Sequence, residues 1–148
     1  MACFISFREE SLRLNNRSFN NAITFAIETG RGESLSAAEN AMLERVAKAV
    51  DDGEYWPGRD IELETDFPEL EERKFWARLF FDTARAIFDE QVGSKTNKSW
   101  RTRMIYVTYS IAHLFVSAVH EHESGWWPNT KDKREEDAFL ASLDNRPD

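Results

Sequence analysis

Apolar residues recur every three or four positions along most of the chain, which is the spacing of amphipathic helices. In the first half of the sequence this pattern predicts a helix over residues 17–29, which stops before the loop signal at 30–32. A second helix is predicted to begin after Ser36, because Ser36 and Glu39 have the spacing of a capping box. Gly53 follows the last apolar position of this helix and should end it.

Longer apolar patterns follow in the second half of the chain. A third helix is predicted over about residues 66–92, with Gly93 as its stop. Apolar positions leave it only a narrow polar stripe, so it should lie at the centre of the fold. A fourth helix is predicted over 99–123 and a fifth over 131–143. The apolar stretch within the fourth helix is shorter than the roughly 20 residues of a membrane span, so we expect a buried core helix.

Residues 60–67 show a different pattern, because apolar and acidic residues alternate strictly. In an extended conformation, alternate side chains point to opposite faces. One face would carry Ile61, Leu63, Thr65 and Phe67, and the other would carry Asp60, Glu62, Glu64 and Asp66. Cys3, Ile5 and Phe7 alternate more briefly, and a lone pair of strands needs helices to pack against.

Length and composition fit one folded domain. The chain has 148 residues, of which 41% are hydrophobic and 13% aromatic, so it can bury a sizeable core. We therefore predict a single, mainly α domain over 1–148: a bundle of about five helices with a short extended segment near 60–67 packed on it. The N-terminal segment 1–16 and the tail 145–148 are expected to be irregular.

The cysteine content bears on the expected compartment. Cys3 is the single cysteine, so the chain cannot form an internal disulfide, and a reducing cytoplasm is the expected location. Residues 1–8 lack the basic start and the long apolar run of a signal peptide.

Acidic residues are concentrated in one segment, residues 51–72. This acidic segment holds ten acids and one base, for a net charge of −9, whereas the whole chain has a net charge of −8. A local concentration of charge creates a field with a direction and selects basic partners. The same charge opposes binding to nucleic acid and to anionic membranes, so neither is expected as a partner.

Part of the acidic segment has a structural explanation. Acids at the start of the third helix suit the positive end of its dipole. The acids without such an explanation lie between two predicted helices, and two aromatic residues of the type that anchors protein interfaces lie among them. We define this candidate face as Glu54, Tyr55, Trp56, Asp60, Glu62, Glu64 and Asp66. Its carboxylates would steer a basic protein partner, while the aromatics would supply affinity.

Catalytic and metal-binding motifs are missing from the sequence. It contains no glycine-rich phosphate loop, no CxxC and no HExxH, so no enzyme activity, no catalytic residue, no cofactor and no metal site are predicted. The run 120–123 reads His-Glu-His-Glu, but side chains two apart on a helix do not converge on one metal ion. The acids from Asp60 to Glu71 fit a calcium loop poorly, because Thr65 stands where the sharp turn needs glycine.

Two alternatives remain open. The first is an enzyme whose polar site lies on the fourth helix, where Tyr106, Ser110, His113 and Ser117 share one arc and a hydroxyl lies beside an imidazole. The second is a homo-oligomeric structural or scaffold protein, in which Trp126, Trp127 and Phe139 cover a partner subunit.

A stand-alone acidic domain without catalytic motifs fits one functional class best. We expect a non-enzymatic protein that binds a basic protein partner, namely a bacterial immunity or inhibitor protein. Such a protein would neutralise a toxin by occluding the toxin's basic active-site surface with the carboxylates of the candidate face.

Overall fold

The computed structural model describes residues 2–53, 60–92, 98–128, 138 and 141. Within these residues the chain forms five helices and a three-stranded sheet, which confirms the predicted mainly α fold with a short strand segment. The predicted helix over 131–143 lies outside the described residues, except for two isolated positions. In chain order the elements are β1 (Ala2–Phe7), β2 (Glu10–Asn15), α1 (Asn16–Arg31), α2 (Ala37–Asp51), β3 (Ile61–Glu62), α3 (Leu63–Asp66), α4 (Leu70–Phe88) and α5 (Lys98–His120).

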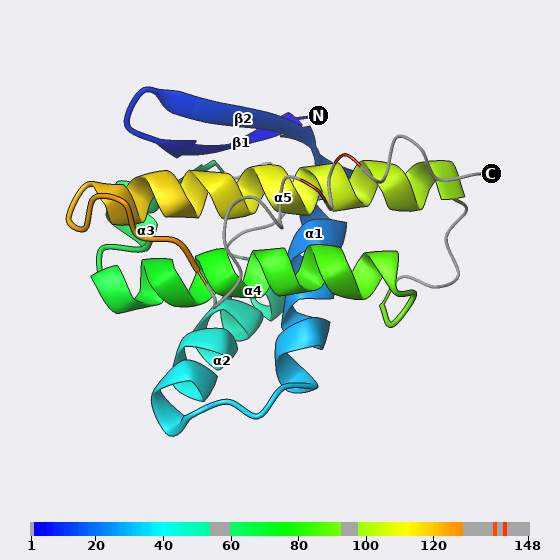
Figure 1. Ribbon diagram of the computed structural model, residues 1–148, viewed down its shortest axis with the longest axis horizontal. Coiled ribbons are helices and arrows are strands. Elements are labelled where there is room, and N and C mark those ends of the chain that lie inside the picture. Colours follow the sequence, from blue (N-terminus) through cyan, green and yellow to red (C-terminus); the bar gives the residue numbers. More distant parts are fainter. Residues whose placement is uncertain (1, 54–59, 93–97, 129–137, 139–140, 142–148) are drawn as a thin grey trace.

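Helices α4 and α5 form the centre of the molecule. Figure 1 shows α4 running beside α5, the hairpin of β1 and β2 on the other side of α5, and α2 beyond α4. Helix α1 contacts both central helices. Helix α4 buries residues on most of its circumference, as its narrow polar stripe predicted. Among the described residues, no helix is long and apolar enough to cross a membrane.

The starts of α1 and α2 are fixed by side-chain caps. The backbone N–H of Ser18 donates to Asn15 Oδ1 at 2.8 Å. At α2 the predicted capping box is confirmed, because Glu39 N donates to Ser36 Oγ at 3.1 Å and Ser36 N donates to Glu39 Oε1 at 3.0 Å. Gly53 follows α2 with φ +76°, the left-handed conformation in which glycine ends helices.

The predicted bounds of the third helix were wrong at both ends. Helix α4 begins at Leu70 because residues 63–66 form the separate turn α3. It ends at Phe88 rather than near residue 92, because Glu90 adopts φ +61°. The Glu90 N–H donates to Ile87 O at 3.1 Å and the Gln91 N–H donates to Ala86 O at 2.8 Å. These two bonds form a Schellman motif in which glutamate occupies the usual glycine position.

Glu90 therefore offers a test of backbone strain. The free energy of unfolding of Glu90→Gly should exceed that of Glu90→Ala by about 1 kcal/mol, because alanine keeps the Cβ that disfavours this backbone conformation. Both variants lose the ion pair of Glu90 with Arg101 (3.0 Å), so the comparison cancels that loss. Urea unfolding of the two variants measures the difference, and an alanine variant as stable as the glycine variant contradicts the strain.

The sheet joins the N-terminal segment to the predicted extended segment. Strand β1 pairs antiparallel with β2, and it pairs parallel with β3 through Ile5 opposite Ile61 and Ser6 opposite Glu62. The N-terminal segment, expected to be irregular, thus forms a regular hairpin. The expectation that all of 60–67 is extended was wrong, because the strand has two residues and the chain then turns into α3.

The turn at α3 has a local cause. Asp66 Oδ2 accepts a hydrogen bond from the Glu62 backbone N–H at 3.0 Å, so a side chain competes with strand pairing for the backbone. Ile61, Leu63 and Phe67 are buried as the alternation predicted, but Thr65 is exposed.

The hairpin is tied to the far end of α5 by its turn. Cys3, Ile5 and Phe7 point into the core, which confirms their predicted shared face. At the turn, Arg8 adopts φ +55° and its guanidinium donates to both carboxylate oxygens of Glu121, at 2.8 and 3.0 Å. This paired contact anchors the hairpin over the helical core.

Candidate functional site

The carboxylates at either end of β3 continue the hydrogen bonding of β1. Asp60 Oδ1 accepts from the Phe4 N–H at 3.0 Å, and Glu64 Oε2 accepts from the Arg8 N–H at 2.6 Å. Strand β3 pairs with β1 over only two residues, between these two contacts. Asp60 and Glu64 of the candidate face thus have a structural role that sequence patterning did not indicate.

A second group of acids fixes α3 against α2 and α4. Asp66 caps its own turn through the Glu62 N–H, as described above. Arg45 of α2 donates to Glu72 Oε2 at 3.1 Å and to the Asp66 carbonyl oxygen at 3.4 Å. The same guanidinium lies 5.1 Å from the centre of the Phe67 ring. These contacts use part of the acidic segment to hold the segment itself in place.

Glu62 differs from the other acids of the candidate face. It is exposed on the sheet, and its carboxylate makes no hydrogen bond or ion pair within the part of the chain that the structure describes. Asp60 is exposed too, while Glu64 and Asp66 are half-buried. A carboxylate has about four acceptor positions, so the capping residues keep some capacity for a partner. The remaining predicted members, Glu54, Tyr55 and Trp56, lie outside the described residues.

Members of the predicted polar arc on α5 contact helix backbone and aromatic rings. The Ser110 hydroxyl donates to the Tyr106 carbonyl oxygen of its own helix at 2.9 Å, and both residues are exposed. The half-buried His113 ring lies 5.4 Å from the Phe81 ring and 5.5 Å from the Trp127 ring. Ser117 is half-buried on the same helix. The arc thus bonds to helix backbone and packs on aromatics at these points.

The tryptophans after α5 pack on their own chain. Trp127 is half-buried and lies 5.2 Å from Phe81, and the Trp126 carbonyl oxygen lies 2.7 Å from His120 Nε2. This contact occupies Nε2 of His120, the first residue of the His-Glu-His-Glu run. Within the described residues, no group of three or more His, Cys, Asp and Glu side chains could hold a metal ion. Phe139, which the oligomer alternative also requires, lies outside the described residues.

A cleft between α1 and α4 was not indicated by the sequence. It has a volume of about 460 Å³ and opens beside the end of α1, the loop that follows it and the end of α4. Several charged side chains come together there from separate elements. The lining residues are Glu28, Thr29, Gly32, Glu33, Asp82, Arg85, Ala86, Asp89, Gln91 and Val92.

Two carboxyl groups meet in this cleft. Glu33 and Asp82 share a side-chain hydrogen bond, and burial, together with the charge of Asp82, raises the pKa of Glu33 to about 7. Arg78 opposes this rise, but it also donates to Glu39 Oε2 at 2.6 Å. The backbone N–H of Ser36, followed by Arg78, lowers the pKa of Glu39. A carboxyl that titrates near neutral pH in a cleft is a feature of functional sites, although structural networks also produce it.

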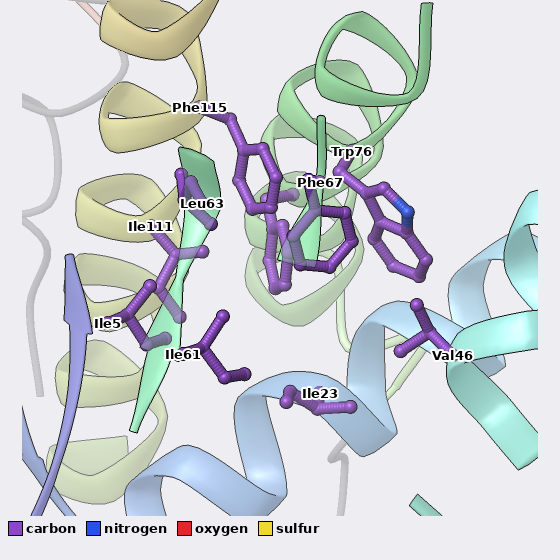
Figure 2. Close-up of a pocket in the computed structure, with 10 residues that line it drawn as sticks. Ile5, Ile23, Val46, Ile61, Leu63, Phe67, Trp76, Ile111 and Phe115 are labelled. Atoms are coloured by element: carbon purple, nitrogen blue, oxygen red, sulfur yellow. The ribbon is translucent and has the colours of Figure 1, made fainter. Parts of the chain in front are cut away.

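A smaller cavity in the core has no functional character. Figure 2 shows its lining side chains converging from the sheet and the surrounding helices. The gap between them is about 20 Å³. Trp76, 1% exposed, brings the one polar side-chain atom of the lining, its indole nitrogen. A buried water needs two to four polar partners, so this cavity is a dry packing gap. The lining residues are Ile5, Ile23, Val46, Ile61, Leu63, Phe67, Trp76, Phe80, Ile111 and Phe115.

Comparisons with known proteins add no relative to this picture. No protein-family model matches the sequence, no curated protein matches it, and no solved structure matches the fold. The functional argument therefore rests on the residues and contacts of this chain.

Proposed function

We propose that the protein acts by binding a basic protein and has no catalytic activity of its own. The class that fits best is a bacterial immunity or inhibitor protein, which covers the basic active-site surface of a toxin. The observation that carries the proposal is the charge distribution: a net −9 within the acidic segment of a chain whose total is −8. Such a concentrated field accelerates encounter with a basic surface and selects against acidic ones.

The geometry of the segment supports an exposed acidic edge. Among the described residues strand β3 lies at the edge of the sheet, and Glu62 in it and Asp60 just before it are exposed. Asp60 is held by the Phe4 amide, so this carboxylate is positioned before a partner arrives. A side chain already held in place loses less freedom on binding. Tyr55 and Trp56, which precede this edge in the sequence and lie outside the described residues, remain the predicted aromatic anchors.

Glu62 separates binding from folding better than its neighbours. Charge reversal of Asp60 or Glu64 also removes a cap on β1, so lost binding in those variants could reflect lost structure. Glu62→Lys removes no hydrogen bond or ion pair of the carboxylate among the described residues. It should slow association with the basic partner about threefold to tenfold at low ionic strength, and weaken the dependence of the rate on salt.

The partner for this experiment is captured from the native host with the wild-type protein as bait, and association rates are then measured over a series of NaCl concentrations. Glu28→Lys makes the same change in net charge on α1, outside the acidic segment, and serves as the matched control. Thermal unfolding should place both variants within about 0.5 kcal/mol of the wild type. Equal association rates and equal salt dependence for the two variants argue against the proposal. A captured partner that has no basic surface also argues against it.

A further inference from the structure

The outer face of the sheet carries an exposed aromatic residue, Phe4. Strand β1 directs every second side chain into the core, and Phe4 lies between two of these, so it points to the opposite face. Phe4 is 40% exposed, and among the described residues Tyr106 of α5 is the one other large hydrophobic residue that is exposed. In Figure 1 the hairpin lies at the outside of the molecule, over α5. A strand with one face on a core usually carries polar residues on its other face, so Phe4 departs from this pattern.

The position of Phe4 is fixed from both sides of its strand. Strand β1 is the middle strand of the sheet, and Phe4 lies directly opposite Arg13 of β2. On the side of β3, the Phe4 N–H donates to Asp60 Oδ1 at 3.0 Å. The next outward residue of β1, Ser6, lies opposite Glu62 of β3. An aromatic residue on a paired central strand has little backbone freedom left to lose on binding.

Charged side chains flank Phe4, with acids on one side of it. Asp60 and Glu62 are exposed on the side of β3, and Arg13 is exposed on β2. The side chains of Glu62 and Arg13 make no hydrogen bond or ion pair within the part of the chain that the structure describes. An aromatic residue surrounded by polar groups is the arrangement of an interface hot spot, in which the ring supplies affinity and the rim excludes water and fixes the orientation.

We propose that Phe4 is an aromatic anchor of the surface that binds the basic protein partner, and that its ring enters an apolar recess beside the partner's cationic side chains. This inference rests on the proposed function and extends its surface from the candidate face onto the outer face of β1 and β2. A basic protein is the occupant that the charges select, because the carboxylates of Asp60 and Glu62 attract cations and repel an acidic surface. Arg13, on the other side of the ring, meets an acceptor group of the partner, so the charges fix how the two proteins are oriented.

An anchor acts on dissociation, whereas the acids act on association. Phe4→Thr removes the ring but keeps a residue that favours strands. With the basic partner that the wild-type protein captures, this variant should raise the dissociation rate at least tenfold and change the association rate less than twofold. Tyr106→Ala removes the other exposed aromatic ring, on α5, and should leave both rates unchanged.

Thermal unfolding separates this role from a structural one. Because Phe4 lies on the outer face of the sheet, Phe4→Thr should melt within about 3 °C of the wild type. A fall of more than about 6 °C identifies the ring as part of the folded core and overturns the anchor.

The same rates distinguish failure of the anchor from failure of the proposed function. If Glu62→Lys slows association and Phe4→Thr leaves dissociation unchanged, the proposed function stands and the anchor is overturned. If the wild-type protein captures no basic protein, the proposed function fails and the anchor fails with it. Sedimentation of the purified chain addresses another occupant, a second copy. A wild-type dimer that Phe4→Thr converts to a monomer assigns this face to self-association and overturns the proposal.

Discussion

Replacing Arg73 with methionine is expected to lower the free energy of unfolding by about 3 kcal/mol. Arg73 lies in α4 and is only 3% exposed. Its Nε donates to the Phe67 carbonyl oxygen at 2.7 Å, and its Nη1 donates to the Ala118 carbonyl oxygen at 3.0 Å. Methionine fills similar space but donates nothing, so two buried carbonyl groups would lose their donors. Arg73 therefore joins the end of the acidic segment to α5.

Urea unfolding followed by tryptophan fluorescence measures this loss. Arg103→Met is the matched control, because Arg103 is exposed on α5 and makes a cation–π contact with Trp100 at 6.0 Å. This control should stay within about 0.5 kcal/mol of the wild type. Arg73→Lys should fall between the two, since a single ammonium cannot reproduce the fork of two separated donors. A loss below about 1 kcal/mol in Arg73→Met means that the two carbonyl groups find other donors.

Truncating Phe67 should destabilise the fold by a similar or larger amount. Phe67 is 4% exposed, and its ring centre lies 5.1 Å from that of Phe115 and 6.3 Å from that of Trp76, edge to face in both cases. Phe67→Ala should cost about 3–5 kcal/mol, because it removes a buried aromatic and enlarges the adjoining cavity. The Arg45 guanidinium of α2 lies over this ring, so the substitution also removes a cation–π contact with α2.

Two further substitutions separate ring burial from a general sensitivity of this segment. Phe67→Leu keeps part of the apolar volume and should lose about half as much stability as Phe67→Ala. Thr65→Ala changes an exposed side chain in the same segment and should lie within about 0.5 kcal/mol of the wild type. Equal losses for Phe67→Leu and Phe67→Ala, measured by urea unfolding, indicate that the edge-to-face contacts account for the whole effect.

Local sequence patterns predicted the helices well, where the signal lies within one element. The capping box of Ser36 and Glu39 is an example, since both of its bonds join residues three apart. The end of α4 could not be predicted in this way. Glutamate rarely adopts the left-handed conformation that Glu90 has, so the sequence favoured Gly93 as the stop. The alternation at 60–67 predicted which apolar residues are buried, but not the turn that Asp66 caps.

The candidate site was predicted less completely, because its contacts join distant parts of the chain. The alternating acids marked the right segment, but the amides that Asp60 and Glu64 cap belong to β1, which no local pattern places beside them. The pair of Glu33 and Asp82 is the clearest case, since the two residues come from different elements and neither has a motif around it. The packing of α1 against α4 brings them together, and the spacing of apolar residues along the chain does not predict which helices pack together.

The contact between Arg8 and Glu121 has a consequence for the order of assembly. The two residues are 113 positions apart, so this contact cannot form until the end of α5 has been synthesised. The antiparallel pairing of β1 with β2 needs only neighbouring residues and can form early. During synthesis the hairpin emerges before α5, so its apolar face lacks the cover of that helix until α5 follows. Cys3, Ile5 and Phe7 on this face therefore become fully covered only late in the synthesis of the fold.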